Sequence, residues 1–348
     1  VDPSLLFREY NFRTVSSPSL VEHFLRFVAD TIAFVECPKG SLVVEIGSND
    51  GTLMKLFKEK GMVPLGIDPA RNIAEEANQE RLETIPEFFT RKLALEIKEK
   101  KGLAHIICAN NVYAHIDDMD DVTSGVKALL APDGVFVFEV SYLVDTVENR
   151  VFETIYHEHV SYHSVKPFVQ FFKRHGLELV HVERISPKGG SIRGYVMHEG
   201  AKDVSSSVNE LVALEKSLNL SDVETYKEFG QYLDGIRSEL HALLTDLKGR
   251  GSTIAGFGAS ITVTTLIYHF ELGSFIDYLV DDNPAKEGLF SPGHHIPVLH
   301  SKALYEKKPD YTIVLAYSYW DSIRKKHEAY VTGGGRFIVP LPKVVLVP

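Results

Sequence analysis

The segment "LVVEIGSNDGTLM" (Leu42–Met54) decides the fold of this chain. An apolar run leads into a turn with two glycines, and a helical pattern follows the turn. The same alternation recurs downstream, with further strand-like runs at 63–68, 104–109 and 134–140, each separated from the next by helical segments. Strands that alternate with helices are typical of right-handed βαβ units. The sequence therefore predicts an α/β fold with a parallel, Rossmann-like sheet.

Two such domains are predicted. The N-terminal forty residues read as helical, and helix- and strand-like segments up to residue 198 complete the first domain. Residues 203–250 resemble long amphipathic helices, and the alternation restarts at residue 252. We therefore predict a catalytic domain over 1–200, a helical bridge over 201–250, and a second, smaller Rossmann-like domain over 251–348.

Composition excludes several classes of protein. The 348 residues are 44% hydrophobic and 24% charged, with a net charge of -10 and interspersed signs. Binding to nucleic acid or to an anionic membrane needs clustered Lys and Arg, so neither partner is predicted. No apolar run reaches the ~18 residues of a membrane helix. Because only Cys37 and Cys108 are present, we predict no disulfide framework and a cytoplasmic location.

The glycine turn differs from a dinucleotide fingerprint. That fingerprint is G-x-G-x-x-G, whereas Glu45, Gly47 and Gly51 form E-x-G-x-x-x-G. An acidic loop repels a diphosphate but suits a cationic ligand that carries an amino acid, such as S-adenosylmethionine (AdoMet). Asp68 ends the second strand, where a carboxylate commonly binds ribose hydroxyls. The alternative is a tight βα turn that binds nothing.

Further cofactor contacts are expected where the next strand ends, because the carboxyl ends of parallel strands form the ligand crevice. Phe88 and Phe89 are candidates to pack on an adenine ring, with ordinary core packing as the alternative. The predicted cofactor site comprises Glu45, Gly47, Ser48, Asn49, Asp50, Gly51, Asp68, Phe88, Phe89, Asn110 and Asn111.

The segment "FETIYHEHVSYHS" (Phe152–Ser164) contains three histidines and two glutamates. It is interpretable as a metal site, a catalytic base cluster or a polar loop. Its histidine spacing matches no familiar set of metal ligands, so no metal is predicted. His157 and His163 are assigned structural roles.

Several motifs together resemble one family. "EIGSNDGTL", "ANNVYAHI", "PDGVFVFEVSYL", "FETIYHEHVSYHS" and "GGSIRGY" occur here in the order and approximate spacing seen in AdoMet-dependent sugar C-methyltransferases. That family includes the C-3'-methyltransferases of the tetronitrose and kijanose pathways and makes branched deoxysugars for antibiotics and surface glycans. The segment from Gly256 to Val298 resembles the last domain of the family. The resemblance implies AdoMet as cofactor and a Rossmann-like class I methyltransferase domain.

The resemblance also implies the reaction, which is C-methylation of a nucleotide-linked 4-keto-deoxysugar at the carbon next to the ketone. The Y-x-E-H motif of the family matches Tyr156, Glu158 and His159, and two further catalytic positions match Tyr10 and His115. A carbon next to a ketone must lose a proton before it attacks a methyl group, and imidazole suits that task at neutral pH.

Each of these residues receives a predicted role. His159 is predicted to be the base, and Glu158 is predicted to orient it. Tyr156, His115 and Tyr10 are candidate donors to the enolate oxygen. The nucleophilic carbon would then take the methyl group from sulfur in line.

Tyr142 and Arg193 are predicted to bind the substrate. Arg193 is a candidate because a guanidinium suits a diphosphate. For Arg193 the alternative is a surface arginine on a β-bulge. Where the family pattern continues with Ala, Lys, Gly and Asn, this chain has Ile261, Thr262, Val263 and Thr264, so the nucleotide is left open. The family commonly opens with a cysteine-rich zinc-binding domain that this sequence lacks. We predict no zinc and leave open whether that domain was removed or never existed.

Three other functions are alternatives. An O- or N-methyltransferase could use His159 on a hydroxyl or an amine. An NAD-dependent sugar dehydrogenase could use the second glycine turn, "GFGAS". A non-catalytic scaffold would not need Tyr-x-Glu-His beside a crevice. The sequence leaves the sugar, the stereochemistry and the pathway open; the oligomeric state is open too, and a monomer is compatible with it.

Overall fold

The computed structural model describes residues 2–10 and 13–347 and consists of two compact units. The first unit comprises the chain up to Val144 together with His157–Leu218, and the second comprises Asp145–Tyr156 and the chain from Asn219 onward. The predicted helical bridge is therefore divided between the units. Its first helix packs on the sheet of the first unit, and its second helix is part of the core of the second unit.

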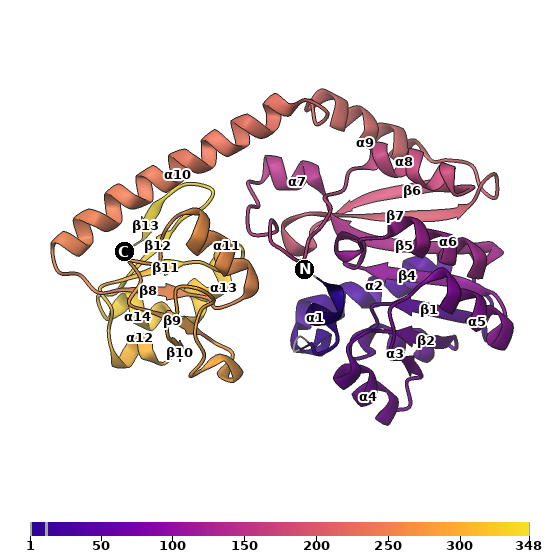
Figure 1. Ribbon diagram of the computed structural model, residues 1–348, viewed down its shortest axis with the longest axis horizontal. Helices are drawn as coiled ribbons and strands as arrows, with labels where there is room; N and C mark the ends of the chain where they lie inside the picture. Colours follow the sequence, from indigo (N-terminus) through magenta and orange to yellow (C-terminus); the bar gives the residue numbers. More distant parts are fainter. Residues whose placement is uncertain (1, 11–12, 348) are drawn as a thin grey trace. The chain divides into compact units, whose positions relative to one another are not determined.

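A sheet of seven strands forms the first unit, in the order β3-β2-β1-β4-β5-β7-β6 (Figure 1). Its strands β1 to β5 are parallel, and β7 runs antiparallel to both β5 and β6. The strand order reverses between β1 and β4, which is where open α/β sheets bind ligands. The strands are β1 (Leu42–Ile46), β2 (Val63–Ile67), β3 (Thr84–Ile85), β4 (Ala104–Asn110), β5 (Leu130–Ser141), β6 (Leu177–Ile185) and β7 (Ser191–His198).

Helices cover this sheet because each has one apolar face. Phe27 of α2 and Phe57 of α3, for example, meet edge to face with ring centroids 6.4 Å apart. The helices are α1 (Pro3–Phe7), α2 (Pro18–Phe34), α3 (Thr52–Glu59), α4 (Arg71–Gln79), α5 (Arg91–Lys101), α6 (Met119–Leu129), α8 (Val165–Arg174) and α9 (Ser206–Ser217). Helix α7 (Leu143–Glu148) crosses the boundary between the units.

The second unit has a six-stranded sheet in the order β10-β9-β8-β11-β12-β13, parallel except for β13. Its strands are β8 (Ile254–Phe257), β9 (Tyr278–Asp281), β10 (Val298–His300), β11 (Tyr311–Val314), β12 (Arg336–Val339) and β13 (Val345–Val347). Its helices are α10 (Val223–Gly249), α11 (Ile261–His269), α12 (Ala303–Glu306), α13 (Trp320–Lys326) and α14 (Glu328–Thr332).

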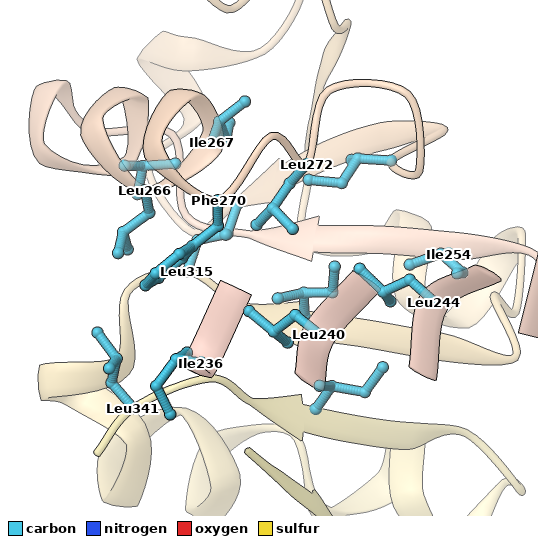
Figure 2. Packing of buried hydrophobic residues seen from close by; sticks show 14 of the residues in the cluster. Ile236, Leu240, Leu244, Ile254, Leu266, Ile267, Phe270, Leu272, Leu315 and Leu341 are labelled. Carbon is cyan, nitrogen blue, oxygen red and sulfur yellow. The ribbon is translucent and has the colours of Figure 1, made fainter. Parts of the chain in front are cut away.

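The long helix α10 is integral to the second unit. Ile236, Leu240 and Leu244 recur every fourth residue, so they share one face of α10. Figure 2 shows these side chains packed among Leu266, Phe270 and other apolar residues of the same unit. The predicted α/β fold with two Rossmann-like domains is thus confirmed. Within the described residues, no helix is both long enough and apolar enough to cross a membrane.

Candidate functional site

The first βα turn passes tightly over the end of the neighbouring strand. Gly47 has φ +71°, and a Cβ added there would lie 2.5 Å from Cγ2 of Val112. Gly51, with φ +74°, is the N-cap of α3. Only glycine combines the left-handed conformation at position 47 with this close approach. Gly47 therefore allows the turn to lie against the segment that follows β4.

Asp68 connects this turn to the end of β2. Its carboxylate accepts hydrogen bonds from the backbone amides of Asn49 (2.8 Å) and Ala70 (2.9 Å). The carboxylate is buried, and burial raises its pKa above the ordinary value. Asp68 thus lies at the ligand edge of the sheet, as the sequence predicted, beside the turn.

Several buried polar atoms around the turn have no hydrogen-bond partner among the described residues. They are Oε2 of Glu45, Oγ of Ser48, and both side-chain polar atoms of Asn110. Buried polar groups are normally paired, so such a group of exceptions indicates a ligand. Burial, followed by the nearby carboxylates of Asp68 and Asp50, raises the pKa of Glu45 well above its ordinary value. A cation would relieve this repulsion, so these residues fit AdoMet, which carries a sulfonium and an ammonium.

The side chains of Asn49 and Asp50 hold the N-terminal segment against the turn. Oδ1 of Asn49 accepts hydrogen bonds from the amide and the hydroxyl of Thr14, at 3.0 and 3.2 Å. Oδ2 of Asp50 accepts from the amide of Val15 at 2.8 Å, and Oδ1 accepts from Thr52 at the start of α3. These predicted cofactor residues thus also attach the N-terminal segment to the turn.

Tyr10 of this segment lies between the turn and the histidine-rich loop. Burial, followed by the charges of Glu158 and Asp68, raises the pKa of its hydroxyl to about 12. The hydroxyl therefore remains a hydrogen-bond donor at neutral pH. Because both carboxylates act on it, Tyr10 joins the predicted cofactor site to the predicted catalytic loop.

His115 and His159 lie together, although they are far apart in the sequence. Their ring centroids are 4.9 Å apart, at an interplanar angle of 64°. The contact is held by the backbone, because the amide of Val160 donates to the carbonyl of Ala114 at 2.8 Å. Glu158 is buried, and burial raises its pKa. The structure therefore brings His115, Glu158, His159 and Tyr10 to one place.

The protonation of His115 corrects one prediction. Nδ1 of His115 donates to the carbonyl oxygen of Glu158 at 2.9 Å. Burial, followed by the charge of His159, lowers the pKa of His115 to about 4. The ring is therefore neutral at neutral pH with its proton on Nδ1, and Nε2 is an acceptor. His115 cannot be the donor to an enolate oxygen that the sequence predicted.

The other members of the loop divide into different environments. His157 is exposed, whereas His163 is buried, stacks on Phe168 at 4.8 Å between centroids, and pairs with Oγ of Ser161. Tyr156 is the last residue of the segment that belongs to the second unit, so its catalytic role stays a prediction. Among the residues that the structure describes, no group of His, Cys, Asp and Glu side chains is arranged to hold a metal ion.

Arg193 does not occupy the environment that the sequence predicted. Its side chain is 3% exposed, and its Nε donates to Oε1 of Glu139 at 2.8 Å. Nη1 lies 3.3 Å from a carboxylate oxygen of Asp30. The alternative of a surface arginine on a β-bulge is therefore wrong. The substrate-binding assignment is also corrected, because the buried carboxylate of Glu139 and the exposed carboxylate of Asp30 already bind the guanidinium.

Tyr142 and Phe89 also require correction. Tyr142 is fully buried, and its hydroxyl donates to Oε1 of Glu215 at 3.0 Å, so it is a core residue rather than a substrate contact. Phe89 is buried beside Gly125 of α6, so it packs in the core, which was the alternative to a contact with an adenine ring. Phe88 is half-buried, with the guanidinium of Arg8 5.0 Å from its ring centroid. Asn111 has φ +59°.

Glu139 is a residue of the site that the sequence reasoning missed. It lies near the carboxyl end of β5, is 2% exposed, and is bound by His23 Nε2 at 2.9 Å as well as by Arg193. A lone carboxylate within the apolar strand "GVFVFEV" was the available signal, because such a group needs a buried partner.

Two family models match the chain. A methyltransferase domain matches residues 20–182, and a C-methyltransferase C-terminal domain matches residues 186–342. A curated relative, the C-methyltransferase NovU of Streptomyces niveus, is 36% identical over 345 residues, covering 99% of this chain and 82% of the relative.

Solved structures resemble the chain only in part. Magnesium protoporphyrin IX methyltransferase (ChlM) from Synechocystis PCC 6803 with bound SAH has a TM-score of 0.40 and 15% identity, covering 55% of this chain and 90% of that one. An S-adenosylmethionine-dependent methyltransferase from Clostridium acetobutylicum ATCC 824 has a TM-score of 0.41 and 11% identity, covering 52% and 92%. These values carry no information about the substrate.

The two family models together span nearly the whole chain, in the order of its two units. The glycine turn, Asp68 and the unpaired polar atoms of the first unit suit AdoMet. The chain therefore belongs to the C-methyltransferase family and is an AdoMet-dependent methyltransferase.

Proposed function

We propose that this enzyme methylates carbon in a nucleotide-linked 4-keto-deoxysugar, at the position next to the ketone. The observation that carries the proposal is the pairing of His159 with a neutral His115, 4.9 Å apart, beside Glu158 and Tyr10. The motifs that resemble the sugar C-methyltransferases support the nucleotide-sugar substrate, and through them a role in deoxysugar biosynthesis for an antibiotic.

The residues divide the work as follows. His159 takes the proton from the carbon, and the carbonyl becomes an enolate. His115 is held by the carbonyl of Glu158 and supports the ring of His159 from the side while adding no positive charge. Tyr10 keeps its proton and donates a hydrogen bond at the end of the site nearest Asp68. When bound beside Glu45 and Asp68, AdoMet supplies an electrophilic methyl group to the carbon.

The test is exchange of the substrate's carbon-bound proton with solvent deuterium while AdoMet is withheld. The wild-type enzyme should exchange the proton next to the ketone, and His159→Ala should lower the rate by about 10²- to 10⁴-fold. His157→Ala is the matched control, since it removes an exposed histidine two residues away. Unchanged exchange in His159→Ala would exclude it as the base.

The same experiment separates this function from methylation of oxygen or nitrogen. An O- or N-methyltransferase transfers a methyl group without ever exchanging a carbon-bound proton. A product with its new methyl group on oxygen or nitrogen, rather than on carbon, would overturn the proposal. Mass spectrometry and NMR of the product show which atom carries the methyl group.

A further inference from the structure

The turn between β6 and β7 contains a lysine in a backbone conformation that side chains rarely adopt. Lys188 lies in the short helical turn η3 (Pro187–Gly189) with φ +57°. Gly189 and Gly190 follow it, also at positive φ. A third glycine at position 188 would remove the strain, yet the chain has a long cationic side chain there. Residues held in such conformations cluster at functional sites, so Lys188 is a candidate for a function.

The strand pairing places this turn at the ligand edge of the first sheet. Because β7 runs antiparallel to β5, it begins where β5 ends, and Ser141 pairs with Ser191. The amide of Tyr142 donates to the carbonyl of Gly190 at 3.3 Å, and Oγ of Ser191 donates to the carbonyl of Pro187. The turn is therefore fixed beside the carboxyl ends of β4 and β5, where His115 and Glu139 also lie.

The charge of Lys188 acts on the catalytic cluster. It is one of the charges that lower the pKa of His115, together with the stronger effects of burial and His159. The Lys188 side chain is exposed, and nearby protein still lowers the pKa of its ammonium by desolvation. Glu139 opposes that effect, but its carboxylate is already held by Arg193 and His23. The ammonium thus retains capacity to bind an oxygen anion.

We propose that Lys188 is a further catalytic residue, whose ammonium binds the carbonyl oxygen of the substrate and stabilises the enolate. This inference rests on the proposed function. Lys188 would donate the hydrogen bond to the enolate oxygen that the neutral His115 does not donate. The oxygen lies two bonds from the carbon that carries the acidic proton, so a cation on the turn at this edge of the sheet, whose charge acts on His115, is suited to bind it. A diphosphate would lie at the far end of the sugar.

Every bond that forms in the two steps is matched by one that breaks. His159 takes the proton from carbon, and the electron pair of that C–H bond becomes a C=C bond while the carbonyl becomes C–O⁻ paired with Lys188. On methyl transfer, the electrons of the C=C bond form the new C–C bond, the carbonyl is restored, and the methyl–sulfur bond breaks. The proton on His159 then leaves to solvent, and Lys188 stays protonated throughout.

Lys188→Gly is the decisive variant, because it removes the ammonium and the backbone strain together. Lys308→Gly is the matched control, since Lys308 is also exposed and has φ +47°, but belongs to the second unit. Both variants should keep or raise the melting temperature. We expect Lys188→Gly alone to lower kcat and the deuterium exchange rate by about 10²- to 10³-fold, as for loss of one oxyanion donor. Lys188→Arg, which keeps the charge, should recover at least part of that loss.

Several results would overturn the inference. One is a kcat of Lys188→Gly within threefold of wild type. Another is an effect on KM alone, as expected of a contact to the diphosphate. The third is a loss of kcat in Lys188→Gly that accompanies a lowered melting temperature. The proposed function fails separately, if wild-type enzyme shows no exchange at all. If the wild type exchanges, His159→Ala does not, and Lys188→Gly matches the wild type, only the role of Lys188 is wrong.

Discussion

The two units contain nearly the same turn and use it differently. In the first unit, Asp68 accepts hydrogen bonds from the amides of Asn49 and Ala70 at 2.8 and 2.9 Å. In the second, Asp281 accepts from the amides of Ala259 and Asn283, both at 2.9 Å. The backbone of a Rossmann-like crevice is thus present twice. The side chains around it decide whether it can bind a ligand.

Those side chains differ in how they are paired. The carboxylate of Asp281 is bound by Nζ of Lys286 at 2.9 Å. After β11, the hydroxyl of Tyr317 accepts a hydrogen bond from the amide of Phe152, and Ser318 donates to Glu153. In the first unit, β4 ends in Asn110, whose side-chain polar atoms are unpaired among the described residues. Polar atoms beside the first turn are thus unpaired among the described residues, whereas Asp281, Tyr317 and Ser318 are paired within the second unit itself.

The largest effect is expected at the buried ion pair of the first unit. Arg193→Met should lower the free energy of unfolding by about 3–5 kcal/mol, because the buried carboxylate of Glu139 would lose its guanidinium partner and keep only His23. The double variant Arg193→Met/Glu139→Met should recover most of this loss. Lys286→Met breaks the more exposed pair of the second unit and should cost less than about 1 kcal/mol. Urea denaturation followed by far-UV circular dichroism measures each difference.

A double variant as unstable as Arg193→Met would show that lost packing, rather than the loss of the guanidinium partner of Glu139, explains the effect. Fluorescence of Trp320, the single tryptophan, reports on the second unit. It is therefore an internal control that should stay near the wild-type transition in the Arg193 variants.

Glu153 of the second unit should produce a pH dependence. Burial raises the pKa of Glu153 to about 7, from an ordinary 4.5. Between these values the folded state keeps a proton that the unfolded state has released, so wild-type stability falls as pH rises through this window. The amide in Glu153→Gln cannot ionise, so this variant does not lose stability through this group as the pH rises. Its stability relative to wild type should therefore increase between pH 5 and pH 8, by up to about 3 kcal/mol.

Urea unfolding monitored by Trp320 fluorescence measures this difference in the unit that contains Glu153. Histidines that titrate in the same range are present in both proteins, so their contributions cancel. A difference between Glu153→Gln and wild type that does not change with pH would contradict the assignment of a neutral, buried Glu153.

The third prediction concerns AdoMet affinity. Asp68→Asn removes the charge but keeps an acceptor for the turn, and should weaken AdoMet binding about 10- to 100-fold, the loss of a hydrogen bond to a charged group. Asp281→Asn alters the matching position of the second unit and should leave the AdoMet affinity unchanged. Isothermal titration calorimetry measures both. Equal losses in the two variants would show that both crevices contribute to binding.

Sequence reasoning succeeded where a pattern is local. The turn at Gly47 and Gly51 lies within a few residues of its strand and helix, and Asp68 ends the next strand, so spacing alone identified them. It failed at Arg193, because Glu139 and Arg193 lie opposite each other on β5 and β7, 54 residues apart in the sequence. Strand register between distant segments is not visible in hydrophobic periodicity. Lys188 was overlooked for the same reason.

The sequence by itself determined the two α/β units and the glycine turn, because strand and helix periods and turn residues act over short distances. The candidates Tyr10, His115, Glu158 and His159 came from the resemblance of the sequence motifs to the sugar C-methyltransferases. Only the tertiary structure decided what these groups can do. Burial and the carbonyl of Glu158 make His115 neutral and an acceptor, and the ion pair with Glu139 removes Arg193 from substrate binding. Protonation and hydrogen-bonding capacity depend on desolvation and on partners brought together by the fold, so no local pattern contains them.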